Sequence, residues 1–253
     1  VSLAVAAIPE GLPAIMTITL AIGVQRMARR RAIIRRLPAV EALGSVTVIC
    51  SDKTGTLTRN EMTVQRVITA DGNLDVSGVG YAPQGGFERD GRELPPDDAP
   101  LLRRIGRAAL LCNDAELSLD GDTWRMVGDP TEGALATLAL KAGIDPRLQR
   151  EELPRDDLIP FESEYRFMAT LHHDPRGEAR IMLKGAPERV LSLCATCIGL
   201  DGRPLPLDAD AWQQRMDEAA ARGMRLLAVA ERQAPGRLDG LRFDDVEQGG
   251  FVL

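Results

Sequence analysis

The longest run of apolar positions stands at the start of the chain. Residues 1–24 are apolar except at Ser2, Glu10, Thr17 and Thr19. A helix of about 20 apolar residues crosses the hydrocarbon core of a bilayer, which is roughly 30 Å thick. The run therefore predicts one transmembrane helix.

After residue 36 the pattern changes to short apolar segments separated by turn signals, which is typical of an α/β fold. Pro38 to Gly44 predicts a short helix, and Val46–Cys50 predicts a buried strand that leads into the loop DKTGTLT. Residues 82–100, rich in Pro, Gly and Asp, predict an exposed loop. The pattern also predicts strands at 62–69, 76–81 and 225–232, helices at 100–112, 130–142, 186–193 and 209–222, and a hairpin of 166–173 with 179–184.

Charge is divided unevenly along the chain. Residues 1–36 hold six arginines and one glutamate, a net charge of +5. Because the whole chain has a net charge of −6, the other residues together carry −11. Arginines just after an apolar run follow the positive-inside rule, which places the remainder in the cytoplasm. An acidic body does not suit a phosphate backbone, which needs clustered Lys and Arg, so nucleic acid is excluded as a partner.

The strongest chemical signal is the seven-residue run from Asp52 to Thr58, DKTGTLT, directly after the predicted strand. Strand ends are where α/β sheets place chemistry. A carboxylate nucleophile splits phosphoryl transfer into two steps through an aspartyl-phosphate. The glycine and the hydroxyl groups beside Asp52 are suited to hold the transferred group against it.

These seven residues match the phosphorylation motif of the P-type ATPases, a branch of the haloacid-dehalogenase fold, and the chain resembles that family throughout. Phosphatases of the same fold carry a second aspartate two positions later as general acid and base, where this chain has Thr54. Without that base an acyl-phosphate persists, which a pump needs to drive a conformational change. The resemblance implies a catalytic group of Asp52, Lys53 and Thr54, with Asp52 and Thr54 helping to hold Mg²⁺.

A second signal lies in the apolar segment, where two prolines flank Glu10 in the string PEGLP. They interrupt a helix in mid-bilayer and free backbone carbonyls, and such carbonyls beside a carboxylate form a cation site. The alternative is a soluble core helix with a salt-bridged glutamate. VAAIPEGLP resembles the fourth transmembrane helix of the calcium and sodium/potassium pumps, which implies Glu10 and the carbonyls of Val5, Ala6 and Ile8 as ligands of the transported cation.

A third signal is the string KGAPE, which begins at Lys184 and reads as a strand end, a turn and a helix start. The chain has only three lysines among 31 basic residues, and two of them are Lys53 and Lys184. A compact ammonium on a flexible stem reaches places that a guanidinium fork does not. The string resembles the family's nucleotide-binding lysine motif, which implies that Lys184 and Gly185 contact ATP.

Four further residues match the nucleotide-binding domain of that family: Glu132 in GDPTEGAL, Phe161 and Arg166 in IPFESEYRFM, and Arg225 in GMRLLAVAE. The resemblance implies that Phe161 stacks on adenine and that Glu132 accepts a hydrogen bond from its amino group. The pattern alone favours a helix cap for Glu132, and leaves core packing for Phe161 and a solvated strand position for Arg225 open. Arg166 stands where the family usually has lysine, which changes the geometry of its contact.

The resemblance divides the chain into three parts. Residues 1–36 correspond to the fourth transmembrane helix with a basic stalk, 37–60 to the start of a haloacid-dehalogenase-like phosphorylation domain, and 61–253 to a nucleotide-binding domain with an antiparallel sheet and helices. The implied protein is multi-pass in the cell membrane, with the nucleotide-binding domain in the cytoplasm. Its implied partners are ATP, membrane lipid, the transported cation and the remainder of the same pump.

Calcium is the first choice of cation, because a broken helix with a carboxylate favours a hard ion over copper or zinc. Sodium, potassium and manganese stay open.

The family's TGES, TGD and GDGxNDxxxL motifs are not in the sequence. In the family the last two complete the magnesium site and neutralise the transferring phosphate. We therefore expect this chain on its own to bind nucleotide without phosphorylating itself or transporting ions. Two other interpretations stay open: a nucleotide-binding module without catalysis, and a soluble phosphatase of the same fold.

Overall fold

The computed structural model describes residues 11–234 and 236–253. Contacts divide the chain between Arg59 and Asn60 into two compact units. The predicted cation ligands Val5, Ala6, Ile8 and Glu10 lie outside the described residues.

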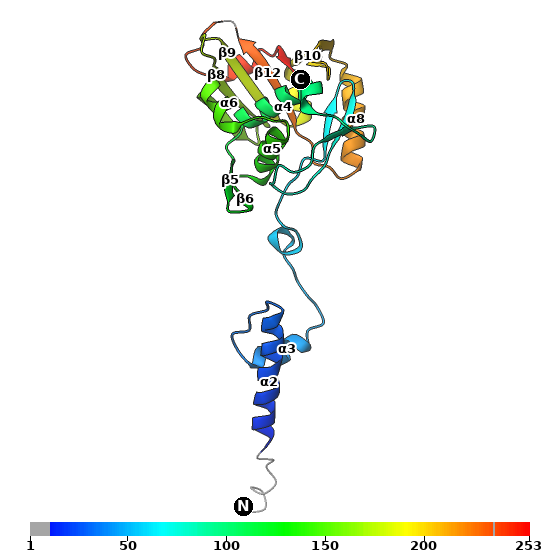
Figure 1. Ribbon diagram of the computed structural model, residues 1–253, viewed down its shortest axis with the longest axis vertical. Helices are drawn as coiled ribbons and strands as arrows, with labels where there is room; N and C mark the ends of the chain where they lie inside the picture. The colour runs from blue at the N-terminus through cyan, green and yellow to red at the C-terminus, as the bar shows by residue number, and fades with distance from the viewer. Residues whose placement is uncertain (1–10, 235) are drawn as a thin grey trace, which may run out of the picture. The chain divides into compact units, whose positions relative to one another are not determined.

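From residue 11 onward, the first unit contains two helices and one wide turn: α2 (Leu12–Arg29), α3 (Pro38–Gly44) and η1 (Lys53–Leu57) (Figure 1). α3 agrees with the predicted helix, and its proline stands at the first turn, where no backbone donor is lost. Along α2 the apolar side chains of Leu12, Ile15 and Ile18 are exposed. Over the described part of the chain, no helix combines the length and the apolar character that a membrane span requires.

The strand predicted at Val46–Cys50 is wrong for this structure, in which these residues form no regular element. Val48 and Ile49 are exposed and pack into no core. A strand is held by hydrogen bonds to a neighbouring strand, and no described segment pairs with this one.

The second unit is built on a seven-stranded sheet with the strand order β11-β10-β13-β12-β9-β8-β7. Neighbouring strands are antiparallel except for the pair β10 and β13. Its strands are β7 (Arg155–Glu162), β8 (Phe167–His173), β9 (Ala179–Gly185), β10 (Cys194–Ile198), β11 (Pro204–Pro206), β12 (Ala228–Ala234) and β13 (Phe251–Val252).

Helices cover both faces of this sheet. On one face, α4 (Pro100–Leu111) and α5 (Pro130–Lys141) lie side by side (Figure 1), and Leu111 and Cys112 pack on Met168 and Met182. The other core is formed by alternate residues of the same strands, such as Leu183, with side chains of α7 (Pro187–Leu193) and α9 (Phe243–Glu247). Two further helices are α6 (Pro146–Glu152) and α8 (Ala209–Ala221).

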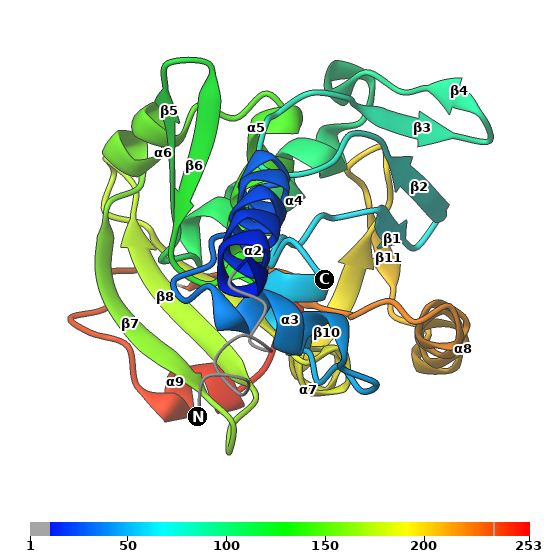
Figure 2. The ribbon, with the colours of Figure 1, turned by 90° about the horizontal axis from the view of Figure 1, so that it is seen from below.

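Two small sheets complete the second unit. One has the order β1 (Arg66–Thr69), β2 (Gly72–Val76), β3 (Phe87–Arg89), β4 (Arg92–Glu93), and a one-turn helix η2 (Pro96–Asp98) follows it. The other is the hairpin β5 (Glu116–Asp120) with β6 (Thr123–Val127), which projects from the unit (Figure 2).

The predicted helices and the 166–184 hairpin agree with α4, α5, α7, α8 and the pair β8–β9. The strand predicted at 76–81 is wrong, because the chain turns at Ala70–Asp71 and β2 ends at Val76. The loop predicted at 82–100 contains the hairpin β3–β4. Its turn is Asp90-Gly91, and both residues have positive φ (52° and 74°), as a two-residue type I′ turn requires.

Candidate functional site

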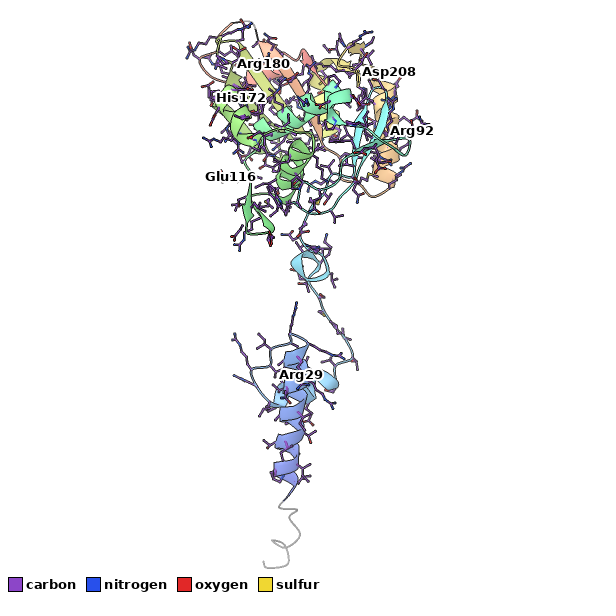
Figure 3. The ribbon with its side chains drawn as sticks, in the orientation of Figure 1. Arg29, Arg92, Glu116, His172, Arg180 and Asp208 are labelled. Atoms are coloured by element: carbon purple, nitrogen blue, oxygen red, sulfur yellow. The ribbon has the colours of Figure 1, made fainter. Side chains whose placement is uncertain are left out.

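Four strands bring residues that are far apart in sequence to one end of the sheet. Across β8, β9 and β12 the register places Met168, Lys184 and Val229 opposite one another. Met168 and Val229 pack in the core under α4, so Lys184 stands on the same face. His172 and Arg180, labelled in Figure 3, are paired at the other end of β8 and β9.

Phe161 reaches this face through an irregularity in β7. Ile159 lies opposite Ala169, but the next pair is Glu162 with Phe167, so β7 has one extra residue at Pro160-Phe161. Without the bulge Phe161 would lie opposite Phe167, whose ring is in the other core. With the bulge, strand alternation directs Phe161 to the face of Lys184, and the residue is 54% exposed. Phe161 is therefore not the core residue that the pattern allowed.

Lys184 is nearly buried, at 5% exposure, and its Nζ donates to Oε1 of Glu132. The other carboxylate oxygen, Oε2, accepts from the backbone N–H of Asp114 at 3.1 Å. A buried ion pair loses the hydration of both charges, and its attraction offsets that cost only where both partners are hydrogen-bonded. Glu132 and Lys184 thus form a fixed acceptor and donor pair on the same face of the sheet as Phe161.

The cap predicted for Glu132 is not how its side chain is used. Asp129 caps α5 through Oδ1, which accepts from the N–H groups of Thr131 at 2.8 Å and Glu132 at 3.3 Å. The Glu132 carboxylate turns away from its own helix to Lys184 of β9. Asp129 alone satisfies the first orphan donors of α5, so Glu132 is available for another purpose.

Gly185 is required by the close approach of β8. A Cβ built on it would lie 2.3 Å from the carbonyl oxygen of Arg166 and 2.7 Å from Cα of Phe167. The carbonyl oxygen of Arg166 also accepts from the N–H of Ala186 at 2.9 Å. Gly185 therefore sets how tightly the end of β9 lies against β8, next to Lys184.

Arg166 and Arg225 are not drawn into the Glu132–Lys184 pair. Arg166 has positive φ (58°) in the turn before β8, and its Nη1 donates to Oε1 of Glu188 at 2.7 Å. Arg225 is exposed in the segment between α8 and β12 and lines a cavity of about 540 Å³. Thr131 also lines that cavity, so Arg225 and the first turn of α5 face a common space large enough for a ligand.

Residues at the end of α4 support the site, and the sequence reasoning missed them. Asn113 donates to the carbonyl of Glu132 at 2.9 Å, and Asp114 binds Arg155 at 2.6 Å. Burial raises the pKa of the Cys112 thiol to about 11, although the nearby Lys184 charge acts in the opposite direction. An Asn directly after a helix end is a capping signal that could have drawn attention to CND.

The loop that carries Asp52 belongs to the first unit, and all three predicted catalytic residues are exposed in it. The Asp52 carboxylate accepts from the N–H of Thr54 at 3.4 Å, and the carbonyl of Lys53 accepts from the N–H of Thr58 at 3.1 Å. Gly55 closes the turn with φ of 73°. The Asp52 side chain is thus presented to solvent at the start of the wide turn η1.

Magnesium fits the donor type at this loop but not a complete site. Within the described ranges, no three His, Cys, Asp or Glu residues are grouped so as to hold a metal ion. Mg²⁺ in phosphoryl-transfer sites is bound by one or two carboxylates together with substrate phosphates and water. The exposed oxygens of Asp52 supply one such carboxylate.

Comparison with known proteins identifies relatives along the entire chain. Residues 101–249 match the family model described as P-type ATPase, cytoplasmic domain N. The chain is 47% identical over its full length to "Cation-transporting ATPase pma1" of a Synechocystis strain and 49% identical to "Probable cation-transporting ATPase F" of Mycobacterium tuberculosis, and it covers 28% of each. It is 44% identical over 94% of its length to human "Calcium-transporting ATPase type 2C member 1", of which it covers 26%.

The chain therefore spans between a quarter and a third of the length of these relatives. The family match covers more than half of the chain and includes α5, β7, β9 and the segment before β12, on which the predicted nucleotide residues stand. The chain belongs to the P-type ATPases.

Proposed function

We propose that this chain is part of an ATP-driven cation pump, in which ATP binds to the second unit and its terminal phosphoryl group passes to Asp52. The phosphorylated state then drives cation transport across the membrane. The names of the relatives, which state cation or calcium transport, support this proposal. On its own the chain binds nucleotide.

The observation that carries the proposal is the exposed ring of Phe161 on the same face as the Glu132–Lys184 pair. A half-exposed aromatic ring on a rigid strand is a platform on which a base can stack, and stacking contributes about 1–3 kcal/mol. The Glu132 carboxylate can accept from the amino group of adenine, and the Lys184 ammonium can donate to a ring nitrogen or a phosphate. Gly185 positions Lys184, and Arg225 faces the neighbouring cavity. Arg166 must release Glu188 before its guanidinium can contact the nucleotide.

Asp52 is the proposed phosphoryl acceptor. Its exposed carboxylate can attack the terminal phosphorus in line, forming the aspartyl-phosphate while the bond to the leaving oxygen of ADP breaks. Lys53 places a positive charge beside the phosphoryl oxygens, and Thr54 denies the site the second carboxylate that would hydrolyse the intermediate. When bound by Asp52 and Thr54, Mg²⁺ supplies charge neutralisation.

The membrane part of the proposal rests on residues 1–36. We propose that they form a transmembrane segment with a basic cytoplasmic stalk, in contact with lipid, in which Glu10 and the carbonyls of Val5, Ala6 and Ile8 bind the cation. Calcium is the first candidate, because a type 2C calcium-transporting ATPase is among the relatives. Residues 37–60 are the start of the haloacid-dehalogenase-like domain, residues 61–253 are the cytoplasmic nucleotide-binding domain, and the complete pump is multi-pass.

The test is calorimetric titration of the chain with ATP. Lys184→Gln is the perturbation and Lys141→Gln is the control. Lys141 is also largely buried, but its Nζ donates to the carbonyl of Ser77 at 2.6 Å, away from Glu132. Losing a charge-assisted hydrogen bond costs about 1.5–3 kcal/mol, so Lys184→Gln should weaken ATP binding by at least tenfold and Lys141→Gln by less than threefold. Equal affinity of both variants contradicts the proposed site, whereas ATP binding without any turnover in the intact protein favours a non-catalytic module.

A further inference from the structure

Asn113 lies just beyond the C-terminus of α4 and is almost fully buried, at 4% exposure. Its side-chain nitrogen donates to two carbonyls, those of Ala109 at 3.0 Å and of Glu132 at 2.9 Å. Its side-chain oxygen accepts from the N–H of Ala115 at 2.8 Å. Three of the four hydrogen-bonding positions of the amide are therefore used: both N–H donors and one of the two lone pairs on the oxygen.

These three bonds join elements that are distant in sequence. Ala109 is in the last turn of α4, where carbonyls have no partner within the helix, so the first bond caps α4. The second bond crosses to the first turn of α5, and the third fixes the chain as it enters β5. A cap alone would need only the first bond.

The second bond acts on the residue that carries the proposed acceptor for adenine. Asn113 holds the backbone of Glu132, and the N–H of the next residue, Asp114, holds Oε2 of the same glutamate at 3.1 Å. With Oε1 bonded to Lys184, the carboxylate is fixed at both oxygens while its main chain is fixed by Asn113. A shift of Asn113 moves all of these contacts together.

We propose that Asn113 is a positioning residue for nucleotide binding, which acts through Glu132 and touches no ligand itself. The inference deepens the proposed function and rests on it. A hydrogen-bonded acceptor loses much of its selectivity when it is misplaced by a fraction of an ångström. Loss of the Asn113 hydrogen bonds should therefore weaken recognition of the base rather than recognition of the phosphates.

The test is a double-mutant cycle in the full chain, with Asn113→Ala, Glu132→Ala and the two together, read as the Kd for ATP. Asn113→Ala should raise the Kd about tenfold in the parent chain and less than twofold when Glu132 is already alanine, since coupled residues are not additive. Asn113→Asp keeps the shape but cannot donate, so it should reproduce the effect if the alanine variant does not fold. Asn73→Ala, at an exposed position of β2, is the control and should leave the Kd unchanged.

Hydrogen exchange separates failure of this inference from failure of the proposed function. In the folded Asn113 variants, the amides of Asp114 and Ala115 should exchange at least tenfold faster than in the parent chain, as should the segment 129–134, whether or not ATP binds. A Kd effect of the same size in both backgrounds, or unchanged exchange at Asp114 and 129–134, overturns the role of Asn113. If the parent chain binds no ATP but amide exchange in the Asn113 variants increases as stated, Asn113 does fix the backbone around Glu132 and the proposed function fails.

Discussion

Replacing Phe161 by alanine tests the base platform with least disturbance of the fold. A Phe side chain has about 150–250 Å² of surface, and with 54% exposed about 100 Å² remains for a ligand to cover. At about 25 cal/mol per Å², complete coverage contributes about 2.5 kcal/mol, and coverage of one ring face contributes somewhat more than half of that. Because 1.4 kcal/mol corresponds to tenfold, Phe161→Ala should raise the Kd for ATP about 10- to 60-fold.

Phe243→Ala is the matched control. Phe243 is also partly exposed, at 40%, but its ring packs on Tyr165 with centroids 4.5 Å apart, over the other core. The control should lower the thermal midpoint and leave ATP affinity within twofold, whereas Phe161→Ala should do the reverse. Calorimetric titration with ATP and thermal unfolding of both variants provide the comparison. Equal ATP affinity of Phe161→Ala and the parent chain would refute the stacking role, and so would equal losses in the two variants.

Three further predictions concern neighbours of the platform. Gly185→Ala should lower the free energy of unfolding in denaturant by about 1–3 kcal/mol, because the added Cβ would lie 2.3 Å from the carbonyl oxygen of Arg166. Unchanged stability would mean that the backbone of β8 shifts to accept the Cβ without cost. Glu132→Gln should reduce the preference for ATP over GTP at least fivefold in competition binding, because an amide can donate to the guanine oxygen where a carboxylate cannot; an unchanged ratio contradicts the role of Glu132. Burial lowers the pKa of His172, so at a given pH the unfolded chain binds more protons at this side chain, and the free energy of unfolding should fall as the pH drops below about 6.5. His172→Gln should therefore show a smaller fall in the free energy of unfolding between pH 7.5 and 5.5 than the parent chain. Equal falls in the two proteins would contradict this role of His172.

The sequence predicted the elements of the second unit well where local signals were strong. The turn at Asp174-Pro175 and the alternation on either side located β8 and β9, and the Asp129-Pro130 start located α5. Lys184 could be placed at a strand end by these signals. Its partner could not, since Glu132 is 52 residues away and its local pattern fits a cap equally well.

The remaining features of the site depend on pairings that no local pattern encodes. The bulge at Pro160 decides which face Phe161 takes, and it is defined only by the register against β8. The apolar run ending at Cys50 fits a strand but finds no neighbour among the described residues. Asn113 was overlooked because its importance comes from a contact between two helices.

The central claim is that Asp52 accepts the terminal phosphoryl group of ATP in the intact pump. Incubating the full-length protein in membranes with ATP labelled at that phosphate, and quenching with acid, measures this directly. The account predicts an acid-stable phosphoprotein that hydroxylamine cleaves, and its complete loss in Asp52→Asn, which keeps the shape of the side chain without its nucleophile. An undiminished acid-stable label in Asp52→Asn would contradict it.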